Sequence, residues 1–268
     1  MKGDTDNLQG KVALVTGGTA GLGLAAALTL ARRGVSISLC GRSSDKGAQA
    51  LAQIEALGAQ ALFVVADVLE YTDMERLVAD TVARFGQIDM LVASGGGSRY
   101  PDTADPRKAI AYFEQIVPTD VTDLIAEAAL AKLNPARAVV DQMIARGSGS
   151  ITFITSEGGR VPTPTQTAIA FYAGGLIAMT RVMAKELSRH RIRVNCVAVS
   201  VVEDTPSFAF LLGDNPEQAK VYDRLRAKAP FGLAKPDDIA EVVAFLASDA
   251  ARFVTGATVS PTGGLTFS

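Results

Sequence analysis

The stretch that decides the fold is Lys11–Gly23, KVALVTGGTAGLG. Its first part, Lys11–Thr16, is a short run of β-branched and apolar residues that predicts a buried strand. A helix is predicted to begin at Gly21. Glycines between a strand and a helix allow a tight turn and let the backbone approach a pyrophosphate, which the N–H groups of the helix terminus favour. We expect the phosphate contacts to come from Gly17, Thr19, Gly21, Leu22 and Gly23.

Beyond this stretch, short apolar runs alternate with longer helical patterns. Strands separated by helices of about 10–15 residues form right-handed βαβ units, which build a parallel sheet. The predicted strands are 11–16, 35–40, 61–66, 88–93, 150–155, 193–199 and 257–260. The predicted helices are 21–33, 44–57, 72–85, 166–188 and 236–248, with helical material up to Arg146 that is interrupted at Pro118 and Pro135.

These elements predict one α/β domain over residues 1–268, with a doubly wound, mainly parallel sheet and helices on both faces. Three segments stand apart from the alternation: a polar N-terminal extension (1–10), an enlarged loop region (94–118) and a substrate-side segment with short helices (200–229).

The composition excludes several classes of function. The 26 basic and 28 acidic side chains give a net charge of −2, so we expect neither nucleic acid nor a membrane surface as partner. No apolar run approaches the roughly 18 residues of a membrane span, and Met1–Gly10 lacks an apolar signal core. Cys40, Cys196 and the single His190 are too few for a disulfide framework or a metal centre. We expect a cytoplasmic protein without a metal.

The end of the second predicted strand, Gly41-Arg42-Ser43, favours one dinucleotide over another. An acidic side chain here would bind the ribose 2′-hydroxyl of NAD(H) and repel a 2′-phosphate. Glycine stands there instead, and the following guanidinium suits a phosphate. The sequence therefore predicts NADP(H), with Arg42 and Ser43 near the phosphate. Asp67, at the end of the third strand, is expected at the adenine amino group; the alternative for Arg42 is a solvated loop charge.

This pattern resembles the short-chain dehydrogenase/reductase family from Lys11 to Gly264. The resemblance implies a seven-stranded Rossmann-type sheet with nicotinamide chemistry at the carboxyl edge of its strands. It is carried by Thr16–Gly23, Asp67-Val68, the strand before Ser156, Arg193-Val194-Asn195, and the tail from Pro236 to Gly264. The cofactor residues it implies also include Val68, Ser94 and Gly95.

The family's catalytic residues are where the likeness ends. The family uses a tyrosine as proton donor, a lysine four residues later that lowers the pKa of the phenol, a serine that orients the substrate and an asparagine in the middle helix. Ser156 falls on the serine, but Ile169, Ala173 and Ala128 fall on the other three. None of the five tyrosines has a lysine four residues later. Ser156 and Tyr172 remain as candidate catalytic residues, with packing on a neighbouring helix as the alternative for Tyr172.

Other motifs on the nicotinamide side also differ from the family. Ala93–Gly96 replaces its Asn-Asn-Ala-Gly, and Val199-Ser200 replaces its Pro-Gly, so we expect weakened binding of the nicotinamide half. Glu203 and Asp204 are candidates for a general base or a cation site, with surface solvation as the alternative. Further polar residues expected near the cleft are Ser98, Arg99, Tyr100, Glu157, Arg160 and Thr205.

Three functions remain open. The first is an NADP(H)-binding oxidoreductase that acts on a small organic metabolite by non-standard chemistry, with a non-redox lyase, isomerase or cyclase as its variant. The second is an inactive partner or nucleotide-binding regulator in a hetero-oligomer with an active relative. The third is an ordinary ketoreductase whose register has been misread. The family likeness implies a homo-oligomer, dimer or tetramer.

Overall fold

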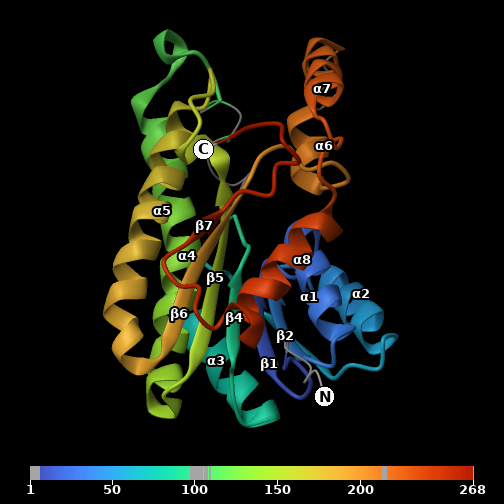
Figure 1. Cartoon of the computed structure of the whole chain (residues 1–268), viewed down its shortest axis with the longest axis vertical. Helices are drawn as coiled ribbons and strands as arrows, with labels where there is room; N and C mark the ends of the chain where they lie inside the picture. The colour runs from blue at the N-terminus through green and yellow to red at the C-terminus, as the bar shows by residue number, and fades with distance from the viewer. Residues whose placement is uncertain (1–6, 97–104, 106–107, 109, 213–215, 268) are drawn as a thin grey trace.

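The computed structural model describes residues 7–96, 105, 108, 110–212 and 216–267, and its centre is one sheet of seven strands (Figure 1). The strand order is β3-β2-β1-β4-β5-β6-β7, and every neighbouring pair is parallel. The chain reverses its direction of winding between β1 and β4, and ligands of such sheets bind beside that point at the carboxyl edge. The strands are β1 (Val12–Thr16), β2 (Ser36–Gly41), β3 (Ala61–Val65), β4 (Met90–Ala93), β5 (Gly149–Ser156), β6 (Ile192–Val199) and β7 (Thr258–Val259).

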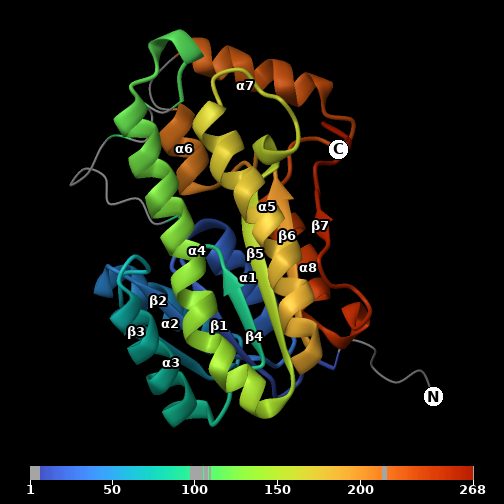
Figure 2. The same cartoon turned by 90° about the vertical axis from the view of Figure 1, so that its left-hand side faces the viewer.

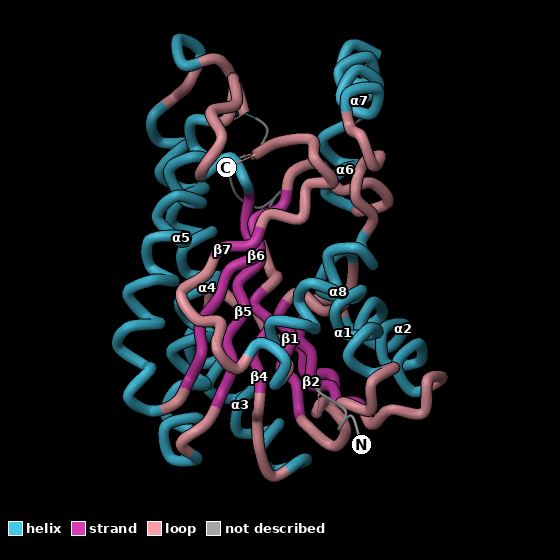
Figure 3. The backbone as a smooth tube through the Cα atoms, viewed as in Figure 1, coloured by secondary structure: helices cyan, strands magenta, loops and turns pink. Residues whose placement is uncertain are grey.

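Helices cover both faces of the sheet, as Figures 1 and 2 show. One layer contains α1 (Gly21–Ala31), α2 (Ser44–Glu55) and α8 (Pro236–Ala247). The other contains α3 (Tyr71–Phe85), α4 (Pro118–Arg146) and α5 (Thr167–Leu187). Figure 3 shows α6 (Pro206–Leu212) and α7 (Pro216–Lys228) beyond the carboxyl ends of the strands. The fold is the predicted doubly wound, Rossmann-like one.

Two apolar cores hold these layers on the sheet. Leu30, Ile37 and Val243 belong to the core between the sheet and the α1–α8 layer. Phe153 and Met143 belong to the core under α3, α4 and α5. Because side chains on both faces of a central strand are buried, β1 is buried at each of its five positions.

One prediction about α4 is wrong, the interruption at Pro135. The helix runs without a break from Pro118 to Arg146, with Pro135 inside it. A proline costs a helix one N–H and crowds the preceding turn, but Pro135 lies on the buried face with Ala136 and Val139, where packing against the sheet holds the helix together. Pro118 does mark a boundary, because the short 3-10 helix Phe113–Gln115 ends before it and α4 begins with it. It occupies the first turn, where its missing N–H would have had no helical partner.

The expectation that no run approaches a membrane span also needs correction. The helical stretch Thr167–His190 is long and apolar enough to cross a membrane by length and composition, with a mean hydropathy of 1.4. A core helix passes the same test, and α5 packs on β5, β6 and α4, with Ala173, Leu176 and Ala184 buried.

Candidate cofactor and active site

The phosphate loop, Thr16–Gly23, has a backbone shaped to hold a pyrophosphate. Gly17 and Gly21 have φ values of 66° and 53°, in the left-handed region that favours glycine. A Cβ at Gly23 would lie 2.2 Å from the carbonyl oxygen of Gly17, so a side chain there would fill the cradle. The N-cap of α1 is Ala20, which makes no side-chain cap, so the first N–H groups of the helix are left for an anion.

The loop after β4 packs backbone to backbone against this cradle. The amides of Ser94 and Gly95 donate to the carbonyl oxygen of Thr16 at 3.2 and 3.1 Å. A Cβ on Gly17 would lie 2.7 Å from Gly95 Cα, whereas a Cβ on Gly95 would keep ordinary distances of 3.5 Å from Gly17 and 3.6 Å from Val68. The hydroxyl of Thr16 is buried without a partner among the described residues, as expected beside a ligand site. The residues present therefore fit a dinucleotide.

The end of β2 lies beside the phosphate loop. A Cβ on Gly41 would come to 3.0 Å from Cγ2 of Thr19, so Thr19 lies over this strand end and a larger residue at 41 would crowd it. Arg42 follows and is exposed. Ser43 caps α2, because its Oγ accepts a hydrogen bond from the Lys46 amide at 3.4 Å. Arg42 thus stands at the rim of the cradle, and Ser43 has a structural partner.

Asp67 is held in a turn after β3. Its Oδ1 accepts from the Leu69 amide at 2.9 Å, and its own amide donates to Asp73 at 2.8 Å. The Arg76 side chain, hydrogen-bonded to Asp73, lowers the pKa of that carboxyl and keeps it an acceptor. This turn places Val68 beside Gly95, so the ends of β1, β3 and β4 meet around one volume.

Ser156 lies at the end of β5 with an aliphatic neighbour. Its Oγ accepts a hydrogen bond from the Gly158 amide at 3.1 Å. A Cβ on Gly158 would lie 3.3 Å from that oxygen and 3.1 Å from Cγ2 of Ile169, so the hydroxyl and this methyl group flank one small volume. Ala173, one turn further along α5, is fully buried, and a Cβ on Gly159 would approach its methyl group to 3.0 Å. Neither Ile169 nor Ala173 can move a proton.

Tyr172 is partly buried on α5, about 60° around the helix from Ile169. Burial raises the pKa of its phenol. The hydroxyl has no hydrogen-bond partner among the described residues, and no cation stands by to lower that pKa. The phenol therefore stays protonated well above neutral pH, which suits a donor better than a base.

Two other predicted cleft residues are tied to the C-terminal segment. Glu157 is buried, and its carboxylate accepts a hydrogen bond from the Thr266 hydroxyl. Arg160 donates to the Thr258 carbonyl at 3.3 Å and to the Ser260 hydroxyl at 3.2 Å. Their contacts join the end of β5 to the chain that follows β6.

The residues after β6 have structural partners as well. Glu203 is paired with Arg226 of α7, whose Nε lies 2.9 Å from its Oε1. Asp204 is exposed, 4.0 Å from the Lys235 ammonium. Thr205 caps α6, because its hydroxyl accepts from the Phe208 amide at 3.0 Å. Among the described residues, no cluster of His, Cys, Asp and Glu could hold a metal ion.

The enlarged loop region is described only in part. Ser98, Arg99 and Tyr100 lie outside the described residues. Ser94 and Gly95 at its start belong to the wall beside Gly17, and a short 3-10 turn, Phe113–Gln115, precedes α4.

Sequence reasoning missed two polar residues of α4. Lys132 Nζ donates to the carbonyl oxygens of Ala93 and Gly95, and Asn134 Nδ2 donates to those of Val68 and Leu69. Both side chains are buried and hold the segments that follow β4 and β3. The signal was present: Lys132 falls at helical spacing with Ala136, Val139 and Met143, on the buried face.

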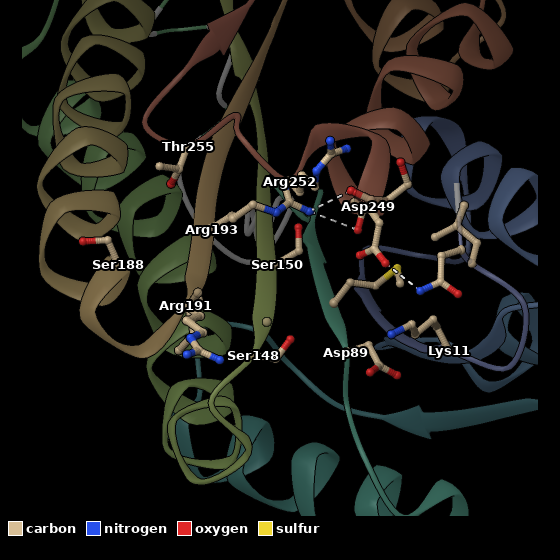
Figure 4. Close-up of a pocket in the computed structure, with 17 residues that line it drawn as sticks. Lys11, Asp89, Ser148, Ser150, Ser188, Arg191, Arg193, Asp249, Arg252 and Thr255 are labelled. Carbon is tan, nitrogen blue, oxygen red and sulfur yellow. Dashed lines mark hydrogen bonds between the residues drawn. The ribbon is translucent and has the colours of Figure 1, made fainter. Parts of the chain in front are cut away.

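A cavity of about 450 Å³ opens at the amino edge of the sheet, opposite the phosphate loop (Figure 4). Arg193 beside it donates to the carbonyls of Leu246 at 2.7 Å and Ser248 at 3.0 Å, closing the end of α8. Asp89 is paired with Arg146 at 2.9 Å. These contacts connect the structural elements at the amino edge of the sheet. Ligands of doubly wound sheets bind at the opposite edge, where the strands have their carboxyl ends.

Comparison with known proteins agrees with this fold. The family model described as short chain dehydrogenase matches residues 11–214. An uncharacterised oxidoreductase of Methylorubrum extorquens is 35% identical over 96% of this chain and 98% of its own. A 3-oxoacyl-[acyl-carrier-protein] reductase of Thermotoga maritima is 31% identical over 96% of this chain and 98% of its own.

A solved structure extends the likeness to three dimensions. The 7α-hydroxysteroid dehydrogenase complexed with NADH and 7-oxo glycochenodeoxycholic acid superposes with a TM-score of 0.86. It is 26% identical and matches 98% of each chain. The chain belongs to the short-chain dehydrogenase family. It is an oxidoreductase of that family by descent, and relatives of its fold hold nicotinamide cofactors.

Proposed function

We propose that this chain binds NADP(H) and acts on a small organic metabolite by chemistry that differs from the family's usual proton transfer. The observation that carries the proposal is the contrast between the two ends of the cleft. At the phosphate end the glycine cradle of Gly17–Gly23 is complete. At the reaction end, the α5 side chain beside Ser156 is Ile169.

The preference for NADP(H) rests on the end of β2. Gly41 leaves no carboxylate to hold a ribose 2′-hydroxyl, and the exposed guanidinium of Arg42 suits a 2′-phosphate through paired hydrogen bonds. When bound, the cofactor supplies the hydride. Asp67, Val68, Ser94 and Gly95 would form the adenine and ribose walls.

At the reaction end, Ser156 is the hydroxyl best placed to orient a substrate oxygen. Its Oγ accepts a hydrogen bond from the Gly158 amide, so the hydroxyl proton is available for donation to a substrate. A carbonyl reduced here must take its proton from water, from the substrate or from Tyr172. General acid catalysis contributes about 10²–10⁴-fold, so ordinary ketoreductase activity should be weaker by a similar factor.

The second candidate is an inactive partner or nucleotide-binding regulator, and the burial of Ala173 beneath Gly159 favours it. No ammonium can reach the nicotinamide ribose from that position. Losing such charged hydrogen bonds weakens the nicotinamide contacts, while the pyrophosphate cradle remains. A non-redox lyase, isomerase or cyclase using Ser156 is the variant of the first candidate that needs no hydride. Both candidates share what the family implies, which is a small-molecule ligand, an oligomer and a cytoplasmic location.

The test combines binding with turnover. NADPH and NADH are titrated by fluorescence into the purified protein and into Arg42→Ala. We expect NADPH to bind more tightly, and the substitution to weaken NADPH by about tenfold while leaving NADH nearly unchanged, because one exposed charged contact is lost. Equal affinities, or no binding, would refute the cofactor assignment.

Turnover then separates the candidates. NADPH oxidation over a panel of ketones, aldehydes and acyl thioesters is compared in the wild type, Ser156→Ala and Tyr172→Phe. Activity lost in Ser156→Ala and kept in Tyr172→Phe supports an unconventional reductase. Binding without turnover supports the regulator or the non-redox enzyme, and co-purification with a related chain selects the partner. Fast turnover on simple ketones would make it an ordinary reductase.

A further inference from the structure

Lys132 of α4 is a buried lysine that the proposed reaction does not use. Its side chain crosses from α4 to the end of β4, where Nζ donates to Ala93 at 2.9 Å and to Gly95 at 2.8 Å. The residue is 6% exposed. Gly95 in turn donates to Thr16 and lies against Gly17. The ammonium therefore stands directly behind the wall of the pyrophosphate cradle.

Asn134, half a turn further along α4, provides a neutral counterpart. Its Nδ2 donates to the carbonyl oxygens of Val68 and Leu69, both at 3.0 Å. It is nearly as buried as Lys132 and also holds a loop of the cofactor cleft. The two side chains thus do the same mechanical task, one with a titratable group and one without.

The burial of Lys132 and the groups around it determine whether its side chain is charged. Burial lowers the pKa of its ammonium to about 7. The titratable group that faces it is the thiol of Cys196 on β6, and burial raises the pKa of that thiol to about 12, so it stays neutral. The Arg160 guanidinium acts on Cys196, and among the described residues no carboxylate acts on Lys132. Near neutral pH the unliganded protein holds a mixture of ammonium and amine.

We propose that Lys132 is a positioning residue that couples the binding of the dinucleotide to the uptake of a proton. This rests on the proposed function, since the bound anion is the pyrophosphate of NADP(H). An ammonium makes hydrogen bonds to carbonyl oxygens that are about twice as strong as those of an amine, and so holds Gly95 more firmly against Gly17. An anion in the cradle favours the charged form in return. Lys132 thus supplies a positive charge on the far side of the loop that contains Gly95. Ala173 of α5 supplies none.

The sign of the pH dependence follows from this linkage. As a general scale, a unit negative charge about 10 Å from an ammonium, at an effective dielectric constant of about 20, raises a lysine pKa by roughly 1. The Lys132 pKa is then higher in the complex than in the free protein. Affinity is greatest below the pKa of the free protein and falls by about tenfold in all as the pH rises through both values. Such a difference between the two pKa values corresponds to about half a proton taken up at pH ~7.5.

Calorimetric titration with NADPH measures this proton directly. The titrations are run at pH ~7.5 in phosphate, HEPES and Tris, whose ionisation enthalpies differ, so the dependence of heat on buffer gives the protons exchanged. We expect uptake of about half a proton by the wild type and none by Lys132→Met, with weaker affinity that no longer changes with pH. Asn134→Ala also loses bonds to the cleft but should keep the proton uptake. Lys132→Arg, permanently charged, should restore affinity without the pH dependence.

The proton uptake measured for Lys132→Met is subtracted from that of the wild type. The difference excludes protons bound or released by the 2′-phosphate and the N-terminal amine. NADPH binding without a difference between wild type and Lys132→Met overturns this inference and leaves the proposed function intact. No binding by any form removes both.

A second readout does not need the cofactor. The lysine Cε resonance that is absent from Lys132→Met or Lys132→Arg should titrate near neutral pH in the wild type. Titration together with the surface lysines, near pH ~10.4, would overturn the inference.

Discussion

Ile169 puts a methyl group beside the hydroxyl of Ser156, and a methyl group has no proton to give. Ala173, one turn on, has no charge with which to change the pKa of a neighbour. Ala173 is buried in the packing of α5 and Ile169 is partly buried beside it, so nothing in the fold requires a reactive pair there. We therefore expect the chemistry at Ser156 to depend on these two side chains of α5.

The double substitution Ile169→Tyr with Ala173→Lys should restore proton transfer. A phenol beside Ser156, with an ammonium one turn away to lower its pKa, can donate to a carbonyl. We expect NADPH-dependent reduction of simple ketones to rise by at least about 10²-fold, measured as NADPH oxidation. Ile169→Phe with Ala173→Met fills similar space without the chemistry and should gain nothing. If the two double variants behave alike, the phenol and the ammonium are not sufficient for reduction, and the role assigned to Ile169 and Ala173 is overturned.

At the scale of elements, hydrophobic pattern predicted most of what the structure contains. β1 is predicted from Lys11–Thr16 because a central strand is apolar on both faces, and α1 from the glycine turn that precedes it. Pro135 misled the prediction because the proline rule describes an isolated helix, whereas α4 is held by the sheet beneath it. Local sequence does not contain that support.

The candidate site was predictable where it depends on backbone shape and was missed where it depends on long-range contact. The turn at 17–23 is recognisable in the sequence because Gly17 and Gly23 leave no room for a side chain. Lys132 reaches the end of β4, 39 residues earlier in the chain, and Glu203 meets Arg226 only when α7 folds back. Which partner a charged side chain will find is set by the packing of helices, and the sequence pattern does not determine it.

The end of α8 offers a test of stability at this scale. Arg193 donates four hydrogen bonds to the carbonyls of Leu246, Ala247, Ser248 and Val254. Arg193→Met should lower the free energy of unfolding by about 2–3 kcal/mol, because buried acceptors lose a charged donor. Urea unfolding measures the change. Arg191→Met, two residues away and exposed, is the matched control and should stay within about 0.5 kcal/mol. If the two substitutions lowered the free energy of unfolding equally, the stabilising role of Arg193 at the end of α8 would be contradicted.

At the scale of the whole molecule, the outer face of α5 predicts self-association. Phe171 is 68% exposed and Val182 is 55% exposed, so an apolar stripe is left uncovered on the chain by itself. Such a stripe is typical of an interface between copies. We expect a dimer or tetramer that Phe171→Glu with Val182→Glu converts to a monomer, measured by sedimentation. Gln53→Glu, an added charge on α2, should leave the assembly unchanged. A wild type that sediments as a monomer would refute this.

The two glycines that meet between β1 and β4 tolerate change unequally. Gly17 has a left-handed backbone and no room for another atom, whereas a methyl group on Gly95 would keep normal distances. A side chain can therefore be added at Gly95 without moving the loop after β1, whereas any side chain at Gly17 would push the two loops apart. Changes to the loop after β4 can accumulate one substitution at a time, while the turn at Gly17 has to keep its glycine.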